Sequence, residues 1–201
     1  MSLKTGGASN CSVVFMRFRF WVIIAAGLFV IGIVAGIAIR NAMPAGIGDL
    51  FSGQETTLGD IETSLGMSHI AILIFIYFKN ALALIVSFLL SPFLCLVPAL
   101  ALLFNSAFIS YVSIEVIQKK SLGFLLAGVL PHGILEIPAL IIGEAASLSF
   151  GVAVIIAVFS KGRRDYLRNS FKENFKYLLI ALALLFPAAI METFVTPLFI
   201  K

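Results

Sequence analysis

The chain alternates long apolar stretches with short polar ones, in a pattern typical of membrane-spanning helices. Residues 20–39 contain no charged side chain, and about 20 such residues in a helix cross the ~30 Å hydrocarbon core of a bilayer. The remaining apolar stretches predict further spans at about residues 68–90, 92–116, 121–160 and 177–197. We therefore predict an all-α, polytopic helical membrane bundle, with residues 1–19 as a cytoplasmic N-terminal tail and residues 20–201 as a single transmembrane domain.

The distribution of charge predicts the direction of the spans. Basic residues gather in the N-terminal tail and in residues 161–176, whereas residues 41–67 contain acidic residues and no Lys or Arg. Cytoplasmic segments carry the excess of Lys and Arg. We therefore expect a multi-pass protein of the cell membrane whose N-terminus and residues 161–176 both lie in the cytoplasm.

This topology requires one net crossing from residues 121–160, although that stretch is long enough for two. The apolar sequence there is interrupted by Pro131, Gly133 and Pro138. Proline removes a backbone donor and favours a break in a helix. We predict about five full spans plus a re-entrant or broken helix at residues 121–145, and six ordinary spans is the alternative.

Ionisable and amide side chains inside the predicted spans are the candidates for an interior site. Such groups are rare at membrane depth and usually face the protein interior or water. We expect Lys79, His132, Glu136 and Glu192 to converge in the protein interior. Asn80 and Asn105 are further polar interior residues.

His132 and Glu136 are four residues apart, so they share a helix face and could hydrogen-bond. They could form a proton-accepting pair or pore lining, or a structural pair that holds the helix to its neighbours. Lys79 needs a carboxylate partner, and Asn80 and Asn105 are typical of interhelical hydrogen bonds.

Metal and catalytic chemistry are expected to be absent. The chain has one further histidine, His69, and zinc usually requires three or four protein ligands. Cys11 lies in the N-terminal tail and Cys95 inside an apolar span, so we predict no disulfide between them. The sequence contains no GxSxG or HExxH motif, so we predict no catalytic residue, no cofactor and no enzymatic activity.

Composition supports a membrane protein and gives no reason to expect a nucleic-acid partner. Hydrophobic residues make up 61% of the 201 positions and charged residues 12%, whereas soluble domains are about a quarter charged. The net charge of +4 is explained by basic cytoplasmic segments, without nucleic acid. Gly32 and Gly36 form a GxxxG face that lets a second helix approach closely, either within the chain or in a second copy of it. We expect the protein to be a homo-oligomer.

The motif around the prolines resembles one known family. The residues that carry this resemblance are Pro131-His132-Gly133, Glu136, Pro138-Ala139, the small residues of 143–151, Asn80, the stretch 188–192 and Thr196-Pro197. Over roughly residues 65–201 the chain resembles the stage II sporulation protein M family. The resemblance implies an integral membrane protein with about five spans. In spore-forming bacteria the family member works in a membrane complex that drives engulfment together with wall-degrading partners, and the family also occurs in organisms that form no spores.

Three functions follow from these observations, in decreasing order of support. The first is a non-enzymatic membrane protein that scaffolds or assembles a complex of membrane or envelope proteins. The second is a small ion or solute channel or transporter that uses the broken PHG-x-x-E segment. The third is an intramembrane hydrolase.

The charge pattern predicts that the N-terminus and residues 161–176 lie on one side of the membrane. Single cysteines introduced at Ser9 and Ser170 should react with an impermeant thiol reagent from the same side. Labelling from opposite sides would exclude the five-crossing topology.

Overall fold

The computed structural model describes residues 7–42, 68–93, 95–159 and 164–199, so most of the acidic segment 41–67 lies outside the described residues. The described chain is helical apart from short turns. Its helices are α1 (Gly7–Ala42), α4 (His69–Leu90), α5 (Leu96–Lys119), α6 (Leu122–Phe159), α7 (Arg164–Ile190), the π-helix η1 (Met191–Val195) and α8 (Thr196–Phe199). Five of these described helical segments are long and apolar enough to cross a membrane. The all-α class and the five spans are therefore confirmed.

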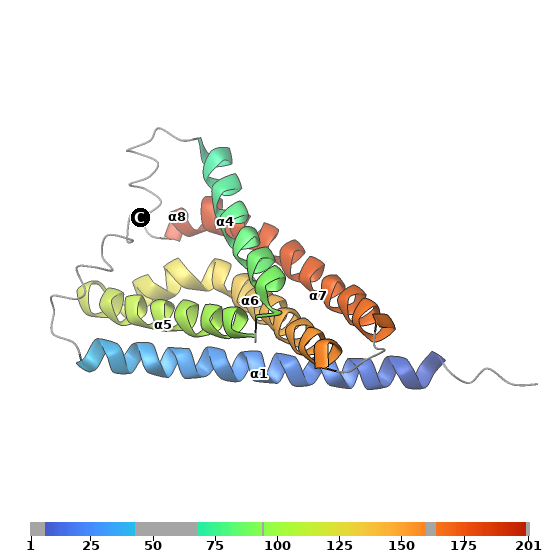
Figure 1. Ribbon diagram of the computed structural model, residues 1–201. Helices are drawn as coiled ribbons and strands as arrows, with labels where there is room; N and C mark the ends of the chain where they lie inside the picture. Colours follow the sequence, from blue (N-terminus) through green and yellow to red (C-terminus); the bar gives the residue numbers. More distant parts are fainter. Residues whose placement is uncertain (1–6, 43–67, 94, 160–163, 200–201) are drawn as a thin grey trace, which may run out of the picture.

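Helix α6 is the centre of the bundle. It packs most extensively on α7 and also contacts α1, α4, α5, η1 and α8. Helices α1 and α5 lie side by side, and α4 is steeply inclined to both (Figure 1). Because α6 touches each of the other described helices, its side chains determine how the bundle closes.

Contacts between helices fix their relative directions. Gly32 of α1 faces Ser106 of α5, and Gly36 faces Ser110, so α1 and α5 run in the same direction. The rings of Phe18 and Tyr177 stack with their centroids 3.4 Å apart. The first turns of the α1 span and the N-terminal half of α7 therefore meet at one end of the bundle, as expected if the N-terminus and residues 161–176 share a side.

Helix α4 runs in the same direction as α6. Asn80 bonds to Glu136 near one end of the pair and Ser87 bonds to Glu144 further along. Helices α4 and α6 thus run one way and α1, α5 and α7 the other. This alternation is what five consecutive crossings require.

The predicted break at Pro131 to Gly133 is wrong. Helix α6 is assigned without interruption over 38 residues with Pro131 and Pro138 inside it, and Figure 1 shows that it bends between its two ends. Proline's fixed φ is compatible with a helix, and each ring removes a single backbone donor. A re-entrant turn would leave more backbone groups unsatisfied at membrane depth. Residues 121–145 are therefore the first part of one long helix, about 57 Å in length at 1.5 Å per residue.

Two helix boundaries also differ from the predicted ones. Helix α1 begins at Gly7, so residues 7–19 of the predicted tail are helical. Helix α7 begins at Arg164, so most of the predicted basic loop at residues 161–176 is the first part of a helix. Neither segment contains proline, and hydropathy marks where a span enters the bilayer, not where its helix begins.

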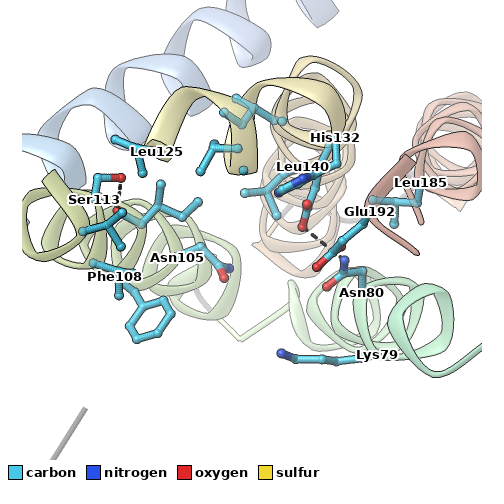
Figure 2. A pocket seen from close by; sticks show the side chains of 18 of the residues that line it. Lys79, Asn80, Asn105, Phe108, Ser113, Leu125, His132, Leu140, Leu185 and Glu192 are labelled. Carbon is cyan, nitrogen blue, oxygen red and sulfur yellow. Dashed lines mark hydrogen bonds between the residues drawn. The ribbon is translucent and has the colours of Figure 1, made fainter. Parts of the chain in front are cut away.

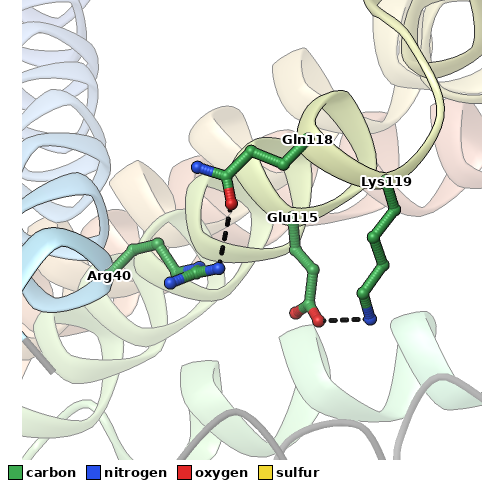
Figure 3. Close-up of polar contacts among 4 residues, drawn as sticks. All are labelled: Arg40, Glu115, Gln118 and Lys119. Atoms are coloured by element: carbon green, nitrogen blue, oxygen red, sulfur yellow. Dashed lines mark hydrogen bonds and ion pairs between the residues drawn. The ribbon is translucent and has the colours of Figure 1, made fainter. Parts of the chain in front are cut away.

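Polar contacts join the ends of α1 and α5. Arg40 donates a hydrogen bond of 3.0 Å to Gln118, and its guanidinium lies 5.8 Å from the ring centre of Tyr111. One turn away, Lys119 pairs with Glu115 at 2.6 Å (Figure 3). These charged side chains mark the end of the bundle at which both helices reach a polar environment.

The GxxxG face of α1 is used within the chain. A Cβ atom at Gly32 would collide with Ser106 and Leu103 of α5, and one at Gly36 would collide with Ser110 and Ala107. The Ser110 hydroxyl donates a hydrogen bond of 3.0 Å to the carbonyl of Ile33 across this contact. Small residues permit this backbone approach, so the face is covered by α5.

Replacing Gly36 by Leu should therefore destabilise the monomeric chain. The added side chain meets the α5 backbone, and overpacking of this kind costs about 1–3 kcal/mol in the free energy of unfolding. Thermal unfolding of the purified protein in detergent measures the effect.

Gly27→Leu is the matched control, because a Cβ atom at Gly27 would meet no neighbouring atom within 4 Å. Equal stability of the two variants, or a change in oligomeric state alone, would contradict the intrachain assignment.

Candidate functional site

A cavity of about 470 Å³ lies between α4, α5 and the first half of α6, and Leu185 of α7 and Glu192 of η1 complete its wall (Figure 2). We call it the polar cavity. Its wall includes all six polar residues selected from the sequence, together with Ser113: Lys79, Asn80, Asn105, His132, Glu136 and Glu192. Apolar side chains of α5 and α6 form much of the remaining wall. All six residues therefore border one cavity, although Lys79 is exposed.

Three of these residues form a tighter group, which we call the His–Glu–Glu cluster. One nitrogen of His132 and one carboxylate oxygen each of Glu136 and Glu192 lie within 4.8 Å of one another. All three side chains are partly buried. His132 and Glu136 share a face of α6 because they are four residues apart, and Glu192 reaches them from η1.

The hydrogen-bond partners in this group differ from the expected pairing of His132 with Glu136. Nδ1 of His132 lies 3.4 Å from the Thr196 hydroxyl, and the Asn80 amide donates a hydrogen bond of 3.1 Å to Glu136 Oε1. The expected role of Asn80 as an interhelical donor is observed, because this bond joins α4 to α6. Thr196 had been noted only as part of the family resemblance.

A local change of helix type positions Glu192 and Thr196. The backbone N–H of Thr196 bonds to the carbonyl of Met191, five residues earlier, and the Thr196 hydroxyl lies 3.3 Å from the same oxygen. This wider turn is the π-helix η1, a form that is rare and often found at functional sites. Its extra residue changes the direction of the side chains on either side of it.

Two of the six residues behave differently from expectation. Lys79 is exposed on the bundle, and among the described residues it forms no ion pair with Glu136 or Glu192. The Asn105 amide donates a hydrogen bond of 2.8 Å to the carbonyl of Ala101 in its own helix. Both side chains line the polar cavity, but neither makes the interhelical contact that we expected.

The family model for stage II sporulation protein M matches residues 25–197. The chain belongs to this family. The match covers most of the bundle and every residue that lines the polar cavity. The resemblance seen in the PHG motif is therefore confirmed.

Two similar proteins come from Methanocaldococcus jannaschii, and both are uncharacterized. One is 27% identical over 153 residues, which cover 75% of this chain and 68% of the relative. The other is 30% identical over 81 residues, which cover 40% of this chain and 46% of the relative. No solved structure matches the chain.

A second buried polar contact in this family member was not anticipated. Glu144 is only 1% exposed, and its Oε2 accepts a hydrogen bond of 2.5 Å from the Ser87 hydroxyl of α4. Glu144 is not among the polar residues selected from the sequence. The small residues that surround it bring α4 and α6 close together: a Cβ atom at Gly143 would lie 2.9 Å from Leu84.

Ser87→Ala should destabilise the bundle, because it leaves the buried Glu144 carboxyl without its hydrogen-bond partner. Such an unsatisfied group costs about 1–3 kcal/mol, to be measured as a loss of unfolding free energy in detergent. Ser113→Ala is the matched control, since the Ser113 hydroxyl bonds to the carbonyl of Ile109 within α5. Equal stability of the two variants would show that the Ser87–Glu144 contact contributes little.

Proposed function

We propose that this stage II sporulation protein M family member is a non-enzymatic integral membrane protein that assembles partner proteins in the bilayer. Its N-terminus lies in the cytoplasm, and it acts as a homo-oligomer or together with membrane or envelope proteins. Family membership over residues 25–197 supports this role. In spore formers the family works within a membrane complex, and assembly is the part of that role that does not depend on sporulation.

The observation that carries the proposal is that polar contacts connect α6 to both α4 and the C-terminal segment. Asn80 and Ser87 attach α4 to α6 through Glu136 and Glu144. Thr196 approaches His132 of α6 from α8. Interhelical hydrogen bonds in membranes are worth about 0.6–2 kcal/mol each. Together they favour one fixed arrangement of helices, which a protein that presents a constant surface to its partners needs.

Chemical cross-linking in native membranes, followed by purification through an affinity tag, tests the assembly role. A discrete complex larger than one chain is expected, with a fixed ratio of subunits or partners. Recovery of the monomer alone, under conditions that cross-link a known membrane complex in the same sample, would overturn the proposal.

A second candidate function is the conduction of a small ion or solute, and the polar cavity favours it. Seven polar side chains, the six selected residues and Ser113, line that cavity, and polar sites at membrane depth often mark ion or substrate pathways. The bend of α6 lies beside it. We rank this function second because Glu136 and His132 already have protein partners.

Two substitutions of Glu136 separate these functions. Gln retains an acceptor for the Asn80 amide but removes the charge, whereas Leu removes both. If the residue is structural, Glu136→Leu should lower the folded yield and the amount of the cross-linked complex, and Glu136→Gln should preserve both.

If the cavity conducts, Glu136→Gln should fold normally and lose ion flux in proteoliposomes. Glu115→Gln, at the end of α5, is the control for loss of a carboxylate elsewhere. Normal folding of Glu136→Leu would contradict the structural role.

A further inference from the structure

The His–Glu–Glu cluster has the spacing of a metal site. Ligand atoms at about 2.0–2.2 Å from one ion lie about 3.5 Å apart. The three donor atoms of His132, Glu136 and Glu192 already lie within 4.8 Å of one another. Small side-chain rotations, without movement of the helices, would bring all three onto one ion.

Electrostatics favours a cation at this position. Two carboxylates this close together in a medium of low dielectric repel each other unless a positive charge or a proton lies between them. Lys79 lines the same cavity, but it is exposed and forms no ion pair with either carboxylate among the described residues. A dication held by both carboxylates would place the compensating charge where it is needed.

The contacts around the cluster orient its donors. Nδ1 of His132 lies 3.4 Å from the Thr196 hydroxyl, and the Asn80 amide donates a hydrogen bond to Oε1 of Glu136. In the proposed site Nε2 of His132 and Oε2 of Glu136 would then bind the ion. Metal-binding histidines and carboxylates usually have such hydrogen-bonded partners, which fix the ring and the carboxylate in place. Thr196 and Asn80 are therefore positioning residues.

We propose that His132, Glu136 and Glu192 bind one divalent transition-metal ion, with water from the polar cavity completing its coordination. One imidazole and two carboxylates suit Zn²⁺, Mn²⁺ or Fe²⁺, whereas Ca²⁺ and Mg²⁺ prefer oxygen ligands alone. The ion would join α6 to η1. The proposal goes beyond the assembly role and does not depend on it.

The sequence alone disfavours this site for a physical reason. The sequence offers His69 as the one further histidine that could serve as a ligand beside His132, and Glu136 as the acidic residue nearest to His132 in sequence. Glu192 is distant in sequence and becomes a ligand only because η1 turns it toward α6. A three-residue site of this kind can be recognised only after the C-terminal segment is placed.

Metal binding to the full-length protein tests the proposal. The protein is purified in detergent with a tag that contains no histidine, stripped with a chelator, and titrated separately with Zn²⁺ and Mn²⁺ by calorimetry. The expected result is one ion per chain and an increase in the melting temperature, because an ion that binds the folded state stabilises it. If neither Zn²⁺ nor Mn²⁺ binds at one ion per chain, the proposal is overturned.

Variants identify the ligands and the positioning residues. Glu192→Gln and Glu136→Gln should abolish stoichiometric binding, and Thr196→Val should weaken it about 10–100-fold through loss of the contact that orients His132. Glu115→Gln, at the far end of α5, is the matched control and should bind as the unaltered chain does. Unchanged affinity in Glu192→Gln would exclude the site.

A spectroscopic measurement keeps the test decisive if a ligand variant fails to fold. Electron spin-echo spectroscopy of the Mn²⁺-loaded, unaltered protein should show coupling to an imidazole nitrogen. Substitution of His69 should leave that coupling unchanged. A stoichiometric ion without nitrogen coupling would contradict the role of His132.

Discussion

Polar side chains on α6 need partners inside the bundle, because the surrounding lipid offers none, and the arrangement of the other helices follows from that requirement. Glu136 is satisfied by α4, Glu144 also by α4, and His132 by α8. Apolar packing alone is a weak orienting force in a membrane, since lipid tails are as apolar as leucine. The polar contacts therefore specify at which height α4 and α8 lie against α6.

The two halves of α6 differ in how closely they pack against the neighbouring helices. Its second half presents small residues, among which Ala145 and Ala146 are fully buried, and these let neighbouring helices approach closely. Its first half contains Pro131 and Pro138 and bends. The bend accompanies the polar cavity, so the same helix combines a tightly packed segment with a segment that borders an open volume. Conduction or metal binding would use the open volume and would rely on the tightly packed segment for rigidity.

Hydropathy and charge were sufficient to predict five apolar helices long enough to cross a membrane and to select six polar residues that border one cavity. Length and composition determine whether a segment crosses the bilayer, and the energetic cost of an ionisable group determines that it turns inward.

The partners of these residues could not be predicted in the same way. His132 contacts Thr196 and not Glu136, because the π-helical turn at residues 191–195 presents that hydroxyl. Glu144 is buried because the small residues around it let α4 approach closely enough for Ser87 to bond to it. The spacing of apolar residues in the sequence does not reveal this contact. The predicted break at Pro131 failed because proline bends a helix more readily than it ends one when neighbouring helices support both sides.

A double-mutant cycle between Asn80 and Glu136 tests most directly the claim that interhelical polar contacts of α6 hold the bundle together. The unfolding free energies of Asn80→Ala, Glu136→Ala and the double variant are compared with that of the unaltered chain in the same detergent. We predict a coupling energy of about 0.6 kcal/mol or more, the size measured for such contacts in membranes. Additivity of the two single effects within about 0.3 kcal/mol would show that the contact contributes nothing to stability and would contradict this account.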